Sequence, residues 1–425
     1  MGVWMMSSVS VFNSYEKETD KFSKQYCSQN YASESFFVCK KNGSYSKCFS
    51  QHASEEQRQC IKYEGPRFAD LWCSEHNCND RFLKLHIRNI IIALGAMFLI
   101  FFIPFPLWRV LAPIAFLGGF ILLMFPLLGI LTPSSGAGFT ANSWIILPVI
   151  GSFQPSEAMK LGIVLYAALW MEKKKKEVES LDSGFIPFVF LTIFATLPVM
   201  MQPDFGSTII LLLISVSIFW LAGGAILHFL YSGVMGAVLL LIAYNSFGYI
   251  KSRIDVFLNP DLADKGDAAF QIDQSFMSIG NGGVFGAGDS TQSFGFLPEI
   301  QGDMIFAATA EQLGFIGMIF IVGLYAFIAY RGVMIAKNAP TRFSMLVAGG
   351  ITAWITSQSL VNMMVVTGLF PLTGITLPLL SYGGSSLLMT MAGIGILLKI
   401  STLTNEDATR GRGNRRSYLS FASAY

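Results

Sequence analysis

Nine long apolar stretches constrain this chain more than any other feature of its sequence. Each approaches the roughly 20 residues that an α-helix needs to cross the hydrocarbon core of a bilayer. They fall at 88–104, 110–131, 154–171, 185–201, 206–222, 226–247, 304–332, 342–368 and 376–400. Hydrophobic residues make up 53% of the chain and charged residues 13%, which is outside the usual range of soluble proteins. The sequence therefore predicts an all-α, polytopic membrane protein.

The first residues of the chain form a short apolar stub, MGVWMMSSVSVFNS. This stub, 1–14, is too short to cross a bilayer, and it lacks the basic region and cleavage site of a signal peptide. We interpret it as the remnant of a truncated first transmembrane helix. The membrane domain proper is expected to cover 86–400, followed by a basic tail at 401–425.

Basic residues gather at three places beside the predicted spans, namely Lys173–Lys176, the connection 331–342 and the tail 401–425. Lysine and arginine near span ends favour the cytoplasmic side. Four spans separate the first cluster from the second and two separate the second from the tail, so all three share one side. Odd numbers of spans then place 15–85 and 248–303 outside, and the C-terminus is predicted to be cytoplasmic.

Every cysteine of the chain lies in the predicted outer segment 15–85. The six residues are Cys27, Cys39, Cys48, Cys60, Cys73 and Cys78. This placement favours a disulfide-stapled subdomain in an oxidising compartment, with fifteen pairings open. A zinc site is the alternative because His76 lies between two of these cysteines, but paired CxxC clusters are absent. We interpret 15–85 as an extracytoplasmic cysteine-rich insert that serves a partner or stability rather than catalysis.

Ionisable side chains within or beside the spans mark candidate sites, because each costs about 2.5–3.5 kcal/mol at the bilayer centre. Glu157 and Lys160, in QPSEAMK, share one helix face. Either they neutralise each other, or Lys160 faces a cavity and binds an anionic group. Asp204 and Asp303 precede spans, where a carboxylate can cap a helix. Glu311 completes the set.

The outer segment 248–303 favours a role for Asp303 beyond capping. A connection of about fifty residues between helices is usually functional. It carries Arg253, the pair Gln271 and Gln274 in FQIDQ, and the glycine-rich run GNGGVFGAG at 280–288. Those glycines would allow backbone N–H groups to converge on an anion, or they form a flexible turn on the membrane surface. No GK[ST] follows, which excludes a nucleotide-binding phosphate loop.

Two further features narrow the class of protein. The net charge of +2 is too small, and its basic clusters too scattered, for a nucleic-acid partner. Near the C-terminus, TGLFPLTGITLPLLSYGGSSLL places prolines and the small-residue cluster Ser381–Ser386 at the start of the last span. This pattern indicates either a broken helix that lines a cavity or close helix packing.

These motifs, in this order, resemble the SEDS family (shape, elongation, division and sporulation), whose members include FtsW, RodA and SpoVE. The resemblance covers roughly 86–400 and the stub. The matching segments are Trp144 with FQPSEAMK (153–160), QPDFGST (202–208), RIDVFLNP (253–260), FQIDQS through GGVFGAG (270–288), FLPEIQGDMIFAATAEQLGF (296–315) and VTGLFPLTGITLPLLSYGGSS (366–386). The resemblance implies a ten-span bundle, here nine full spans plus a truncated first helix, with a large outer loop between spans 7 and 8.

The resemblance also implies a function. SEDS proteins polymerise lipid II into peptidoglycan strands at the bacterial cytoplasmic membrane, together with a class B penicillin-binding protein and other divisome or elongasome proteins. The ending LLKIS and the doubled serine of LSYGGSS lean towards the FtsW division type. The family's essential aspartate, the expected catalytic base, falls on Asp303. Its cavity positions fall on Trp144, Glu157, Lys160, Asp204, Arg253 and Gln274. A divalent cofactor such as Mg or Mn stays open.

Departures from the family pattern remove basic groups. Ser143 stands where an arginine is usual, Gln301-Gly302 replaces a His-Thr pair, and Ser293 replaces a frequent lysine. These changes put the family's contacts to the pyrophosphate in question. Lys160 and Arg253 would then have to bind more of the pyrophosphate charge. Two alternatives to the enzyme stay open: a lipid II flippase or transporter, and a non-catalytic scaffold that activates the penicillin-binding protein.

Overall fold

The computed structural model describes residues 81–132, 143–147, 151–259, 267–288 and 301–422. The predicted helix remnant 1–14 and the six cysteines of the insert lie outside these residues. So does Ser293, one of the departures from the family pattern.

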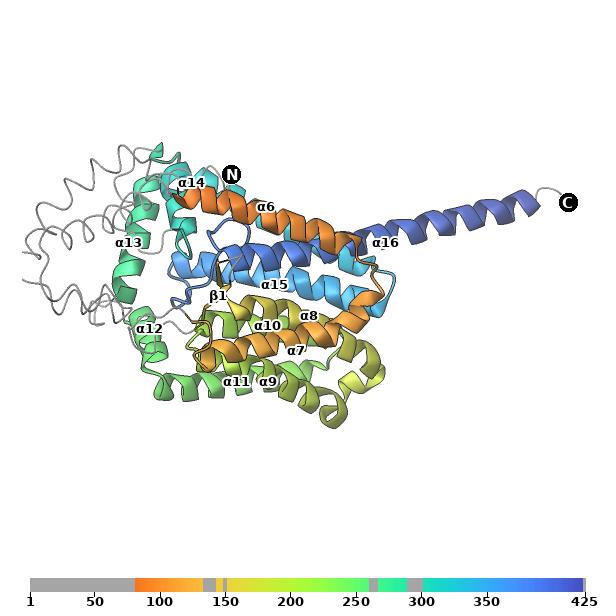
Figure 1. Ribbon diagram of the computed structural model, residues 1–425, viewed down its shortest axis with the longest axis horizontal. Coiled ribbons are helices and arrows are strands. Elements are labelled where there is room, and N and C mark those ends of the chain that lie inside the picture. The colour runs from red at the N-terminus through yellow and green to blue at the C-terminus, as the bar shows by residue number, and fades with distance from the viewer. Residues whose placement is uncertain (1–80, 133–142, 148–150, 260–266, 289–300, 423–425) are drawn as a thin grey trace, which may run out of the picture.

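Each of the nine predicted apolar stretches corresponds to a helix in the described part of the chain (Figure 1). These helices are α6 (Arg81–Phe102), α7 (Leu107–Leu127), α8 (Pro155–Lys174), α9 (Ile186–Met201), α10 (Phe205–Leu221), α11 (Ile226–Ser246), α14 (Ile305–Lys337), α15 (Arg342–Val366) and α16 (Gly384–Ala422). The last helix differs most, since α16 begins at Gly384 rather than at 376 and continues to Ala422 beyond the predicted end at 400. Residues 376–383 are not helical.

Six helices of the described residues are long and apolar enough to cross a membrane. They are α6, α7, α11, α14, the first part of α16, and α9 with the short turn η4 (Leu181–Phe185) before it. The other three, α8, α10 and α15, are shorter or more polar and have many buried residues. Neighbouring helices rather than lipid cover these residues, so they tolerate polar side chains. The protein is a multi-pass helical membrane protein.

Small residues let the helices approach closely. α6 packs on α16, α7 packs on α8, and both α10 and α14 pack on α15. A Cβ atom added at Gly162 of α8 would lie 3.0 Å from the carbonyl oxygen of Ala115 in α7. One added at Gly395 of α16 would lie 2.7 Å from the carbonyl oxygen of Met97 in α6. Packing without room for a side chain is typical of membrane helix interfaces.

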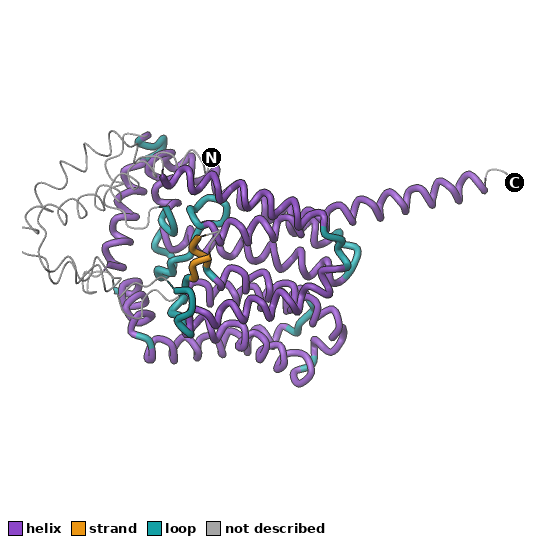
Figure 2. Tube along the Cα trace, in the orientation of Figure 1, coloured by secondary structure: helices purple, strands orange, loops and turns teal. Residues whose placement is uncertain are grey.

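Non-helical backbone gathers at one end of the bundle (Figure 2). There, β1 (Ile145–Leu147) and β2 (Gly151–Phe153) form an antiparallel hairpin in which Ile145 pairs with Phe153. The helices α12 (Gly248–Leu258) and α13 (Asp267–Gly282) lie at this end, whereas α16 runs out of the opposite end (Figure 1). The segment 248–303, expected to be a long connection, is therefore largely helical where it is described.

The glycine-rich run 280–288 packs against a break in α14 instead of presenting its N–H groups to an anion. Gly314 interrupts the helix with φ 67° and ψ −167°. Across this break, Phe315 N donates to Gly283 O at 2.9 Å, and Ala287 N donates to Glu311 O at 2.8 Å. A Cβ atom at Gly286 would lie only 2.1 Å from Gln312 O. The glycines therefore allow the two backbone segments to pair closely. The sequence had suggested an anion site or a flexible turn on the membrane surface instead.

Candidate functional site

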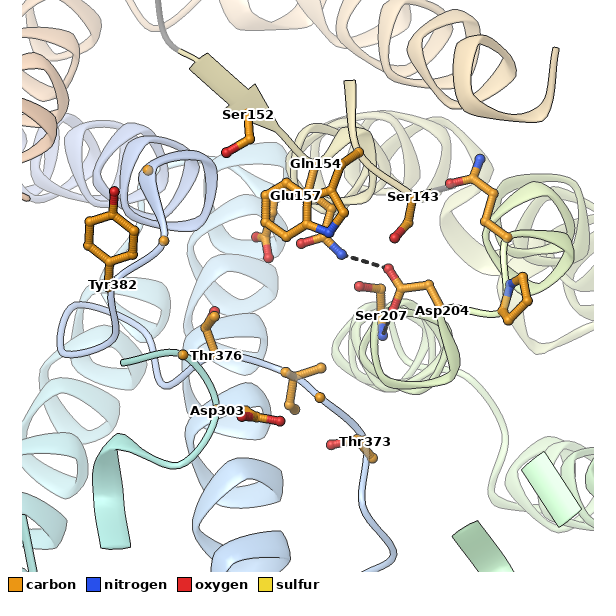
Figure 3. A pocket seen from close by; sticks show the side chains of 18 of the residues that line it. Ser143, Ser152, Gln154, Glu157, Asp204, Ser207, Asp303, Thr373, Thr376 and Tyr382 are labelled. Atoms are coloured by element: carbon orange, nitrogen blue, oxygen red, sulfur yellow. Dashed lines mark hydrogen bonds between the residues drawn. The ribbon is translucent and has the colours of Figure 1, made fainter. Parts of the chain in front are cut away.

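A cavity of about 820 Å³ opens at the end of the bundle where the non-helical backbone gathers (Figure 3). Its walls come from α6, the β1–β2 hairpin, the starts of α8 and α10, α12, α13 and the segment 373–384. Five of the seven predicted site residues line it, namely Trp144, Glu157, Asp204, Arg253 and Asp303. Motifs that are far apart in the sequence thus converge on one space.

Asp303 lies just before α14, whose N-cap position is Met304. The side chain borders the cavity although the residue is only 9% exposed. Its Oδ1 accepts a hydrogen bond from Gln271 Nε2 of α13 at 3.3 Å. Its main-chain oxygen accepts from Asn362 Nδ2 of α15 at 2.8 Å. Asp303 is therefore held by two helices that lie far apart in the sequence.

Arg253 reaches the same cavity from α12. Its guanidinium stacks over the ring of Tyr249 at 4.1 Å, and Nη1 donates to Leu372 O at 2.8 Å. Burial lowers the pKa of Arg253, while Tyr249, Asp303 and Asp204 raise it. The net effect lowers the pKa of Arg253. A guanidinium is not deprotonated in proteins, so the group is a fixed cation beside the cavity.

Gly374 marks the gap between Arg253 and Asp303. A Cβ atom added there would lie 3.7 Å from Arg253 Nη1 and 3.9 Å from Asp303 Oδ2. The glycine also has φ 74°, which side chains rarely adopt. A cation and a carboxylate thus flank a space that a methyl group would fill.

Asp204 confirms the capping prediction and also lines the cavity. Its Oδ1 accepts from Ser207 N at 3.0 Å, which caps α10. Its Oδ2 accepts from Gln154 Nε2 at 2.8 Å and from Ser156 Oγ at 3.1 Å. Three donors fix this carboxylate, on a different side of the cavity from Asp303 (Figure 3).

Lys160 does not line the cavity. Its contacts match the alternative in which Lys160 and Glu157 neutralise each other. Its Nζ lies 2.8 Å from Glu157 Oε1 and 2.8 Å from Gln358 Oε1, and the residue is 0% exposed. Glu157, one turn nearer the start of α8, reaches the cavity wall. The pair therefore lies at the base of the site, with Lys160 on its inner side.

Gln274 is likewise absent from the lining, and Gln271 takes the place expected for it. The amide of Gln274 is 3.7 Å from Met277 Sδ on its own helix. The two glutamines are three residues apart in α13, so the phase of the helix decides which one meets Asp303. The motif FQIDQ contained both candidates, but the phase is not visible without the packing against α14.

Arg88 and Tyr249 are lining residues that the sequence interpretation did not select. Arg88 and Arg253 are the cations among the described residues that line the cavity. Tyr249 precedes Arg253 by four residues, and this spacing on a helix would have indicated their contact.

In the described part of the chain, no three His, Cys, Asp or Glu residues could together hold a metal ion. The described residues therefore do not fit a divalent ion held by protein ligands alone.

Sequence comparison finds relatives over most of the chain. Residues 71–406 match the family of cell cycle proteins named for FtsW, RodA and SpoVE. Stage V sporulation protein E of Bacillus subtilis (strain 168) is 37% identical over 338 residues, covering 78% of this chain and 90% of that protein. A probable peptidoglycan glycosyltransferase FtsW of Geobacter sulfurreducens is 36% identical over 323 residues, covering 76% of this chain and 85% of that protein.

Solved structures share the fold. A chain of a peptidoglycan synthase complex, studied for the coordination of polymerization and crosslinking, superposes with a TM-score of 0.63 at 26% identity. The match covers 76% of this chain and 89% of that chain. Rod shape determining protein RodA of Thermus thermophilus superposes with a TM-score of 0.52 at 23% identity, over 76% of this chain and 87% of that one.

Proposed function

This chain belongs to the FtsW, RodA and SpoVE family, the SEDS family that its motifs resemble, and on that premise we propose that it is a peptidoglycan glycosyltransferase. It polymerises lipid II into glycan strands during cell division or elongation. Relatives at about 36% identity are named for this activity. The observation that carries the proposal is the gap at Gly374, which Asp303 and Arg253 flank inside one cavity.

The proposed reaction inverts the configuration of one sugar. The donor sugar of lipid II is α-linked to a pyrophosphate, and the polymer is β-linked. The acceptor hydroxyl oxygen attacks the anomeric carbon while the bond from that carbon to the pyrophosphate oxygen breaks, and its electron pair leaves with the pyrophosphate. Asp303 takes the proton of the acceptor hydroxyl as general base.

The leaving pyrophosphate needs fixed positive charge beside the base. Arg253 supplies it, since its stack on Tyr249 and its bond to Leu372 O hold the guanidinium next to the gap. Arg88 on α6 is the second cation of the lining. These two arginines take the role that the sequence suggested for Lys160, which is engaged by Glu157 and Gln358.

The proposal includes an orientation and a partner. The cavity, with 248–303 and the insert 15–85, lies on the outer face of the bacterial cytoplasmic membrane, and the tail 401–425 is cytoplasmic. A class B penicillin-binding protein crosslinks the strands, and the insert is a candidate docking module for it. The similar fold in a peptidoglycan synthase complex supports such a partnership. The charge distribution supports the orientation.

A reconstitution experiment tests this function. The purified chain is placed in liposomes with lipid II, and glycan strands and lipid translocation are assayed separately, each with and without reducing agent. Strands formed by the chain alone support the proposal. Translocation without strands would indicate a flippase. Strands that form only with an added class B penicillin-binding protein, and persist when Asp303 is replaced, would indicate a scaffold.

A further inference from the structure

Two neutral amides form a buried ladder on α15 beneath the cavity. Gln358 and Asn362 are four residues apart, so they lie one above the other on the same helix face. Gln358 is 0% exposed and Asn362 is 1% exposed. The NH₂ groups of both amides donate to the backbone that builds the site.

Asn362 joins the proposed base to the opposite wall segment. Its Nδ2 donates to Asp303 O at 2.8 Å and to Ile375 O at 2.8 Å. Both neighbours are main-chain carbonyl oxygens, which only accept, so the NH₂ end of the amide must face them. One side chain thus uses both of its amide hydrogens to hold two backbone segments together.

Gln358 holds the next residue of the same wall segment. Its Nε2 donates to Thr376 O at 3.0 Å. Its Oε1 accepts from Lys160 Nζ at 2.8 Å and from Trp354 Nε1 at 2.9 Å. Lys160 and Trp354 therefore fix the direction of the Gln358 amide. Gln358 and Asn362 together hold Ile375 and Thr376, directly after Gly374.

We propose that Asn362 is a positioning residue for Asp303, acting through the main chain on either side of the gap at Gly374. This inference rests on the proposed function. Asn362 joins the main chain of Asp303 to that of Ile375, the residue after Gly374, by two hydrogen bonds. The amide thereby sets how far the base stands from the site of the acceptor hydroxyl. A small misplacement of a catalytic group can cost about 100-fold in rate, so this contact is expected to act on kcat.

The first test compares Asn362→Leu, which keeps the branched shape and the number of side-chain heavy atoms but removes both donors, with Ser359→Ala. Ser359 is a matched control because it is buried on the same helix and its hydroxyl donates to Ile355 O within α15. Asn362→Leu is expected to lower kcat for lipid II polymerisation at least about 10-fold and to leave KM within about 2-fold. Ser359→Ala is expected to keep both constants. Melting temperatures of all proteins are measured by tryptophan fluorescence.

The second test uses Asn362→Asp, which separates positioning from packing. The ionised carboxylate has no donor and would face two carbonyl oxygens, whereas the protonated form restores one O–H donor. The ratio of variant to wild-type kcat is expected to rise several-fold as the pH falls from about 8 to about 6. Dividing the kcat of the variant by that of the wild type at each pH cancels the effect of titratable groups that both proteins share. The groups common to both proteins on α15 and the elements around it include Asp303, Glu311, Glu157, Lys160, Asp204, Arg253, Asp273, Lys399, Tyr325, Glu172 and Arg342.

Each outcome decides the inference. A folded Asn362→Leu chain with wild-type kcat overturns it, and so does an Asn362→Asp ratio that does not change with pH. If Asn362→Leu does not fold, the pH series of Asn362→Asp decides alone. If Asn362→Asp folds at no pH, the contact stabilises the fold rather than the base, and the inference is overturned. If the wild-type chain makes no polymer, the proposed function itself is wrong. That result differs from all those above, in which the wild-type chain is active and only the role of Asn362 is decided.

Discussion

Lys160 Nζ lies 2.8 Å from Glu157 Oε1, with both side chains buried in the helix bundle. Gln358 is the second partner of the lysine, also at 2.8 Å. A buried pair of this kind is sensitive to loss of one member, because the remaining charge stays in a low-dielectric environment. Lys160 is engaged by these two partners outside the cavity lining, and we propose that it stabilises the bundle rather than contacting substrate.

Lys160→Met is therefore expected to destabilise the protein by about 3–5 kcal/mol, because Glu157 would keep an unpaired buried charge. The double variant Lys160→Met/Glu157→Gln should recover much of the melting temperature, and thermal unfolding monitored by tryptophan fluorescence would check both. A single variant with an unchanged melting temperature and a raised KM for lipid II would restore Lys160 to the substrate site.

Arg253→Lys is expected to raise KM for lipid II about 10-fold, because an ammonium group replaces neither the stack on Tyr249 nor the fork that reaches Leu372 O. Steady-state polymerisation kinetics would measure the change. Lys251→Gln is the matched control, since Lys251 is an exposed residue of the same helix outside the cavity lining. Equal kinetics for both variants would argue against pyrophosphate binding by Arg253.

Gly374→Ala is expected to lower polymerisation at least about 10-fold, because its methyl group would enter the gap between Arg253 and Asp303. Gly223→Ala controls for the backbone. Gly223 has φ 88°, and a Cβ atom there would meet no atom within 4 Å. Both variants carry a similar conformational cost of about 1–2 kcal/mol. If the two lose the same activity, strain rather than the gap explains the loss.

Hydropathy was sufficient to place the nine long apolar helices but not α12 and α13. The resemblance to the SEDS family implied that Asp303, Arg253 and Asp204 share one cavity, and all three line it. The resemblance implied a cavity position for Gln274, whereas Gln271 lines the cavity in this structure. Which of the two does so depends on how α13 packs, in a segment expected to be a connection. Spacing alone could not separate the two alternatives for Lys160, because a residue three positions from Glu157 suits pairing and cavity lining equally.

Asn362 was missed for a different reason. Ionisable side chains inside the spans indicate sites most strongly, because their burial is the most costly. A neutral amide costs less to bury, and Gln358 and Asn362 lie four residues apart in α15. That spacing would have indicated a polar face directed at a partner. The partner itself, a non-helical segment on another part of the chain, emerges only from the fold.

The most direct test of the central claim is polymerisation of purified lipid II by Asp303→Asn. The substitution keeps the shape of the side chain, and its amide oxygen can still accept from Gln271, but it removes the proton acceptor. Asp255→Asn is the matched control, since Asp255 bonds to Tyr244 Oη and lies outside the cavity lining. We expect Asp303→Asn to lower kcat by about 100-fold or more with an unchanged melting temperature, and Asp255→Asn to remain active. Glycan strands made by Asp303→Asn at the wild-type rate would contradict the assignment of Asp303 as the base.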